Sequence, residues 1–157
     1  MISKILRGLV AAIAVGGIVV SSLALHVHNM DPGLAPPCAV DETWDCGAVN
    51  HSRYAVFPPK SFDEDPAGKN IHIPVSVIGI VGYSLIAIFA LFGRWWIVLQ
   101  LAEIGFFSAA LLSYLEAFVL QKWCIYCVWS QSLITAILLL TIVAAIHRHR
   151  SKRPVLA

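Results

Sequence analysis

Four long apolar runs dominate the pattern of hydrophobic and polar positions along the chain. They cover residues 5–27, 71–92, 95–120 and 123–146. Each run is near or above the roughly 20 residues that a helix needs to cross a hydrocarbon core of about 30 Å. Backbone groups in lipid must be paired within the segment, and the alternating pattern of a membrane barrel is absent, so helices are predicted. We therefore expect one all-α domain over residues 1–157, a bundle of four transmembrane helices.

Lysine and arginine are unevenly placed relative to these runs, and their placement predicts the orientation of the helices. The segment over residues 28–70 holds seven acidic and three basic residues. Basic residues favour the cytoplasmic side, so this proline-rich segment is predicted to be a long extracytoplasmic loop that drapes over the helix ends. The connection at residues 121–122 is so short that the third and fourth helices should be antiparallel neighbours. The opposite, cytoplasmic side collects Lys4, Arg7, Arg94, Arg148, Arg150, Lys152 and Arg153.

Composition supports a bilayer as the solvent of this protein. Hydrophobic residues make up 59% of the chain, the mean hydropathy is +0.79, and charged residues reach only 13%, about half of the usual share of roughly 25%. The formal net charge of +2 is too small for a nucleic-acid surface. We expect lipid around the helices and no nucleic-acid partner.

Cys124 and Cys127 are three residues apart at the predicted start of the fourth helix. This spacing places two thiols on one helix face and within reach of a disulfide. The positive end of the helix dipole stabilises a thiolate, which is both the nucleophile and the leaving group of thiol–disulfide exchange. The pair is therefore interpreted as redox active, with a buried structural disulfide as the alternative. No histidine has ligand spacing to the pair, so no metal is expected.

Cys38 and Cys46 lie eight residues apart in the predicted outer loop. We expect a mobile disulfide, exposed to solvent, that accepts electrons from a partner protein and passes them to the close pair. A static staple within the loop is the alternative. Two cysteine pairs on one face of a bundle favour the relay.

Two carboxylates, Glu103 and Glu116, lie inside the predicted third span. An ionisable group at membrane depth is a functional hypothesis by default, and either group is a candidate to relay protons. Alternatively, Glu116 reaches the interface and Glu103 pairs with a polar side chain of a neighbouring helix.

The chain combines a loop cysteine pair at this spacing with four motifs: Cys46-Gly-Ala-Val-Asn-His-Ser52-Arg-Tyr, Ile73-Pro-Val-Ser-Val-Ile-Gly79, Tyr114-Leu-Glu116 and Trp123-Cys-Ile-Tyr-Cys127. In this order the motifs resemble the vitamin K epoxide reductase family, especially its bacterial members, over nearly the whole chain. The resemblance implies a four-helix bundle that encloses a quinone near the outer surface. It also implies that Cys127 faces the quinone, that Cys124 exchanges with Cys46, and that Cys38 faces the partner protein.

Four further residues are candidates to bind the quinone by this resemblance. Ser52 matches a loop serine of the family, and Tyr54 is placed to close a lid over an apolar site. Gln131 lies at the position where animal members of the family carry a tyrosine. Ser76 lies one residue after the position where they carry an asparagine. The alternatives are an ordinary turn residue for Ser52, an interfacial aromatic for Tyr54 and a helix-packing polar residue for Gln131.

The predicted function is that of a membrane thiol–disulfide oxidoreductase that supports disulfide formation. Electrons pass from the thiols of a separate thioredoxin-like thiol oxidase through Cys38/Cys46 to Cys124/Cys127, and then to menaquinone, ubiquinone or vitamin K. The expected location is a bacterial inner membrane, with both cysteine pairs on the periplasmic side. One alternative is an enzyme of the endoplasmic reticulum that reduces vitamin K epoxide or quinone, for which Asn50-His-Ser52 is a glycosylation sequon. A non-enzymatic membrane scaffold with structural disulfides is the other.

Overall fold

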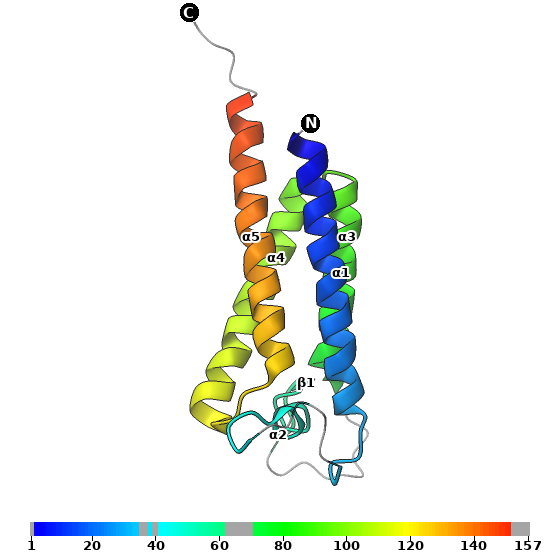
Figure 1. Cartoon of the computed structure of the whole chain (residues 1–157), viewed down its shortest axis with the longest axis vertical. Helices are drawn as coiled ribbons and strands as arrows, with labels where there is room; N and C mark the ends of the chain where they lie inside the picture. Colours follow the sequence, from blue (N-terminus) through cyan, green and yellow to red (C-terminus); the bar gives the residue numbers. More distant parts are fainter. Residues whose placement is uncertain (1, 35–37, 39–40, 62–70, 152–157) are drawn as a thin grey trace, which may run out of the picture.

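The computed structural model describes residues 2–34, 38, 41–61 and 71–151, and these residues are mostly helical. The helices α1 (Ile2–His28), α3 (Val75–Leu91), α4 (Trp95–Tyr114) and α5 (Ile125–Ser151) run along the long axis of the molecule (Figure 1). A π-helical segment, η1 (Leu115–Leu120), extends α4. Residues 35–37, 39–40 and 62–70 of the predicted loop, and Lys152 and Arg153 of the basic tail, lie outside the described residues.

Among the described residues, three helical segments are long and apolar enough to cross a membrane. They are Lys4–His28, Trp95–Leu120 and Ile125–His147, with 25, 26 and 23 residues. Helix α3 is apolar but shorter, with 17 residues, or about 26 Å at 1.5 Å per residue. The prediction of helix from residue 71 onwards is wrong for residues 71–74, because Ile73–Pro74 forms strand β2 instead. Proline also disfavours helical geometry in the residue before it, so α3 begins directly after Pro74.

Helix α1 packs against α3 and α5, and α4 packs against α5 and α3. The expected antiparallel contact between the third and fourth apolar runs is thus confirmed by α4 and α5. The tightest approach of α1 to α3 is at Gly17, where a side-chain carbon would collide with the ring of Tyr83. Tyr83 donates a hydrogen bond from Oη to the Ser130 carbonyl oxygen of α5 at 2.9 Å, which ties the three helices together.

The turn from α3 to α4 lies at the end of the molecule where α1 begins (Figure 1). Gly93 has a φ of +69°, which glycine adopts without steric strain. Its N–H donates to the Ala90 carbonyl at 2.9 Å, and that of Arg94 donates to the Phe89 carbonyl at 3.0 Å. This pair of bonds is a Schellman motif, which satisfies the last carbonyls of α3 and ends the helix.

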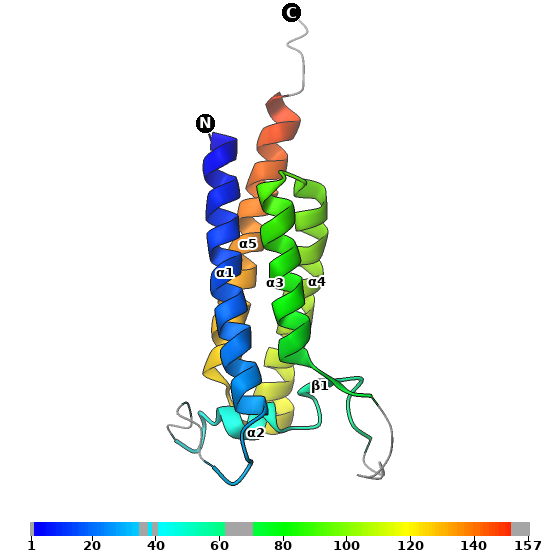
Figure 2. The same cartoon turned by 90° about the vertical axis from the view of Figure 1, so that its right-hand side faces the viewer.

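The opposite end of the molecule carries the described part of the segment that precedes α3 (Figure 2). This segment contains helix α2 (Cys46–Asn50) and strand β1 (Val56–Phe57), which pairs antiparallel with β2 (Ile73–Pro74). Asp45 caps α2 by accepting the Ala48 N–H at 3.0 Å, which satisfies a backbone donor that a short helix leaves open. The segment predicted as a loop over the helix ends therefore contains short elements of secondary structure in its described part.

Candidate functional site

The first cysteine pair is a disulfide between Cys38 and Cys46, whose Cα atoms are 5.8 Å apart. Cys38 is 6% exposed and Cys46, the first residue of α2, is 0% exposed. The expectation of a solvent-exposed disulfide is therefore wrong. The bridge is buried because it packs into an apolar cluster at the end of the helices, together with Val27, Val49 and Cys124.

The second pair, Cys124 and Cys127, consists of two free thiols. Cys124 directly precedes α5 and Cys127 lies in its first turn. The pKa of the Cys124 thiol is lowered, first by a hydrogen bond with the Cys127 thiol and further by the backbone N–H groups of Cys127 and Tyr126. A lowered pKa means that more of Cys124 is thiolate at neutral pH, the form that attacks disulfides.

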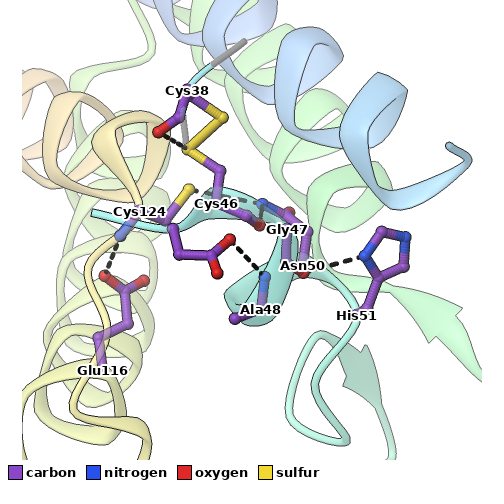
Figure 3. The surroundings of a disulfide bond; sticks show 9 residues. Cys38, Cys46, Gly47, Ala48, Asn50, His51, Glu116 and Cys124 are labelled. Carbon is purple, nitrogen blue, oxygen red and sulfur yellow. Dashed lines mark hydrogen bonds between the residues drawn. A yellow bond between two sulfur atoms is a disulfide. The ribbon is translucent and has the colours of Figure 1, made fainter. Parts of the chain in front are cut away.

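Asn50 connects the two cysteine pairs, and the sequence analysis did not identify this role. Its amide nitrogen donates to the Cys46 carbonyl oxygen at 2.9 Å and to Cys124 Sγ at 3.4 Å (Figure 3). The backbone carbonyl oxygen of Asn50 lies 2.6 Å from His28 Nδ1. The sequence carried no signal for this role, because the contact with Cys124 joins segments far apart in the chain. The Asn50 amide is buried and occupied, so it is not placed to accept a glycan.

A cavity of ≈ 590 Å³ lies among α1, α3, α4 and α5 next to the second pair. Cys127, Tyr126 and Glu116 line it at the end near the cysteines. Most of the other lining side chains are apolar, and a few polar ones, such as those of Asn50 and Ser130, lie among them. A volume in this range, with mostly apolar walls and a few polar groups, is typical of a site for a small organic ligand.

Three of the four residues predicted to bind quinone line this cavity: Ser52, Tyr54 and Ser76. Ser52 Oγ is buried and has no hydrogen-bond partner among the described residues, which leaves it open to a ligand. Gln131 is not part of the lining, and its amide nitrogen donates to Thr135 Oγ1 at 3.4 Å within α5. Tyr83 was not predicted as a lining residue but is one.

The two carboxylates of the third apolar run have different surroundings. Glu103 is exposed on the outer face of α4. Glu116 is only 2% exposed, lines the cavity, and accepts the backbone N–H of Cys124 on Oε2 at 3.1 Å (Figure 3). Across residues 2–34, 38, 41–61 and 71–151, no three His, Cys, Asp or Glu side chains converge to hold a metal ion.

Apolar helices long enough to cross a bilayer, a disulfide, and two thiols beside an apolar cavity define an integral membrane protein with redox-active sulfur chemistry. The model of the vitamin K epoxide reductase family matches residues 8–142. The chain therefore belongs to this family of membrane oxidoreductases, which generally use quinone as electron acceptor. A comparison with curated proteins finds no match.

Proposed function

We propose that this protein is a quinone-dependent thiol–disulfide oxidoreductase that supports disulfide formation in other proteins. The observation that carries the proposal is the placement of the second cysteine pair: Cys127 lines the apolar cavity, whereas Cys124 lies in the same buried cluster as Cys46. One pair of thiols thus connects a disulfide on one side to a ligand cavity on the other.

The electrons enter at the outer pair in this proposal. The dithiol of a separate thioredoxin-like partner attacks Cys38, which is the less buried of the two sulfurs, and reduces the Cys38–Cys46 bond. Cys46 then attacks Cys124 in a Cys124–Cys127 disulfide, and Cys127 leaves as thiolate. Cys38 attacks Cys46 of the resulting Cys46–Cys124 mixed disulfide, which re-forms the Cys38–Cys46 bond and releases Cys124 as thiolate. The result is an oxidised outer pair and a reduced inner pair, which is the arrangement found in the structure.

The cavity is the proposed quinone site. Oxidation of the Cys124/Cys127 dithiol delivers two electrons and re-forms its disulfide, and the quinone is reduced to the hydroquinone. Ser52 Oγ is a free hydrogen-bond donor for a quinone oxygen, and Tyr54 and Ser76 line the same region. Ile78 and Leu85 of α3 and Ile104 of α4 line the cavity yet are exposed, so the cavity has a side open to lipid where an isoprenoid tail would extend.

The proposal also assigns the number of membrane spans and the side on which each end of the molecule lies. Helix α3 is taken as a fourth span, because 17 apolar residues are within the range that tilting or local thinning accommodates. Lys4, Arg7 and Arg94 lie at the end where α1 begins, and this end is assigned to the cytoplasm. Both cysteine pairs then lie at the periplasmic side of a bacterial inner membrane.

A reconstituted system tests the proposed activity. The purified protein in lipid nanodiscs, supplied with a dithiol and either menaquinone or ubiquinone, should produce one hydroquinone for each disulfide formed. Vitamin K epoxide is included as a competing substrate to distinguish the epoxide-reducing alternative. Absence of quinone reduction, with both cysteine pairs resistant to mild reductant, would support a structural scaffold instead.

A further inference from the structure

Glu116 carries a buried carboxyl group that takes no part in the electron transfer described above. It lies in the π-helical segment η1, and such segments are rare and frequently occur at functional sites. One oxygen, Oε2, accepts the Cys124 backbone N–H at 3.1 Å. The other, Oε1, is buried without a hydrogen-bond partner among the described residues. Figure 3 shows the carboxyl group directed at Cys124 from the neighbouring segment.

Within the part of the chain that the structure describes, the Glu116 carboxyl interacts with the two thiols and not with a cation. A buried carboxylate is ordinarily paired with a positive charge, because desolvation alone makes its burial unfavourable. Lys122, six residues later, donates its ammonium group to the Glu42 carbonyl oxygen instead. The titratable side chains that interact with the Glu116 carboxyl are those of Cys124 and Cys127. The carboxyl group therefore faces the redox-active pair and, as a lining residue, the cavity.

Quinone reduction by thiols requires protons to move as well as electrons. A dithiol that becomes a disulfide loses two protons and two electrons, and a quinone that becomes a hydroquinone gains both. The walls of the cavity are mostly apolar, so few groups there are able to carry a proton. A carboxyl group within reach of both the thiols and the cavity is suited to this task.

Building on the proposed function, we propose that Glu116 carries a proton from the Cys127 thiol to an oxygen of the quinone. The Cys127 S–H bond breaks and its proton moves to Oε1 of Glu116. The Cys124–Cys127 bond forms as two electrons leave the sulfurs, and the proton on Oε1 moves on to one quinone oxygen, which restores the carboxylate. The proton that Cys124 released to water when it became thiolate is matched by a proton from water at the second oxygen.

Glu116→Gln separates this role from a purely structural one. Glutamine has nearly the same size and still offers an oxygen to the Cys124 N–H, but it does not transfer protons in this way. Thiol–disulfide exchange should therefore be retained and quinone reduction lost. Glu103→Gln is the matched control, because Glu103 lies in the same apolar run and faces away on the exposed side of α4.

The experiment measures the two half-reactions separately on the full chain in nanodiscs. Reduction of the oxidised protein by dithiothreitol reports exchange, and stopped-flow oxidation of the pre-reduced protein by menaquinone reports the second half-reaction. We expect Glu116→Gln to slow quinone reduction about 100-fold or more while exchange stays within about threefold of wild type. Glu103→Gln should leave both rates within about threefold. Wild type should show a normal solvent deuterium isotope effect on quinone reduction, which Glu116→Asp should retain.

The outcomes distinguish this inference from the proposed function. If wild type does not reduce quinone, the proposed function is wrong. If wild type reduces quinone and Glu116→Gln does so at a similar rate, or if the variant slows both half-reactions equally, the proton-transfer role is wrong and Glu116 only positions Cys124. Should Glu116→Gln fail to fold, the isotope effect on wild type decides, and its absence would overturn the inference.

Discussion

Trp44 and Trp123 are paired in an isolated parallel β-bridge, and their ring centroids lie 6.3 Å apart. The Asp45 N–H donates to the Trp123 carbonyl at 3.0 Å, and the Trp123 N–H donates to the Thr43 carbonyl at 2.8 Å. The bridge joins the segment before α2 to the segment before α5. Cys124 directly follows Trp123, and Cys46 lies two residues after Trp44. Exchange between the two cysteines therefore does not require a long excursion of the outer loop.

The first prediction concerns the fourth span. In a variant without native cysteines, Phe92→Cys and Leu34→Cys introduce thiols at sites that are 75% and 60% exposed. Phe92 lies at the turn between α3 and α4, so it should be on the cytoplasmic side if α3 crosses the membrane. A membrane-impermeant maleimide added to intact cells should label Leu34→Cys only. Equal labelling at both positions would contradict the four-span topology.

The second prediction concerns the packing of α1 on α3. Gly17→Ala should lower the free energy of unfolding by about 1–3 kcal/mol, because the added carbon collides with the Tyr83 ring and displaces its hydrogen bond to Ser130. Gly8→Ala is the matched control, since nothing lies within 4 Å of the added carbon. Thermal unfolding in detergent measures both variants. An equal melting temperature for the two variants would show that the close approach of the helices at Gly17 does not contribute to stability.

The third prediction concerns quinone recognition by Ser52. Ser52→Ala removes an unpartnered buried hydroxyl that lines the cavity. A lost hydrogen bond of about 0.5–1.5 kcal/mol raises KM for the quinone about three- to tenfold, while reduction of the protein by dithiothreitol stays unchanged. Ser132→Ala is the control, because that hydroxyl is exposed and bonds to the Val128 carbonyl within α5. Equal steady-state KM values for the two variants would argue against a quinone contact at Ser52.

The fourth prediction concerns the ionisation of Cys124. The protein is titrated with Cys38 and Cys46 replaced by serine and with the inner pair reduced. The thiolate absorbance near 240 nm should then appear at pH values below the ordinary thiol pKa of about 8.5. Because the Cys127 thiol is the first cause of the lowered pKa, adding Cys127→Ala should move the midpoint upwards. A lowered pKa of Cys124 gives more thiolate at neutral pH, and loss of the Cys127 thiol should give less thiolate. A midpoint that stays constant or falls in the Cys127→Ala variant would contradict this explanation.

The sequence alone predicted the helices well and the outer segment poorly, for physical reasons. Length and hydropathy are sufficient to detect spans such as Trp95–Leu120, because lipid leaves the backbone few choices. The five-residue helix α2 depends on one cap from Asp45 and on packing against α1, and a hydrophobic period does not detect it. The burial of Cys46 follows from that packing, which is a tertiary effect.

The sequence likewise predicted one part of the candidate site and missed another. The spacing of Cys124 and Cys127 predicted a reactive pair at a helix start, and α5 begins between them, at Ile125. Glu103 and Glu116 were equivalent in the sequence, since both are carboxylates within one apolar run. Only the packing of η1 beside the start of α5 distinguishes the buried residue from the exposed one. Asn50 and Tyr83 were not identified because their contacts join segments far apart in the chain.

Transfer of electrons from Cys46 to Cys124 is the central claim, and trapping its mixed disulfide tests that claim most directly. Cys38 resolves this intermediate in the forward direction and Cys127 resolves it in the reverse direction. A Cys38→Ala/Cys127→Ala variant should therefore form and keep a Cys46–Cys124 bond when it is reduced and reoxidised. Non-reducing peptide mapping should find this bond, and a reductant should remove it. Free Cys46 and Cys124 thiols in that variant would contradict the relay and would indicate that the partner reacts with Cys124 directly.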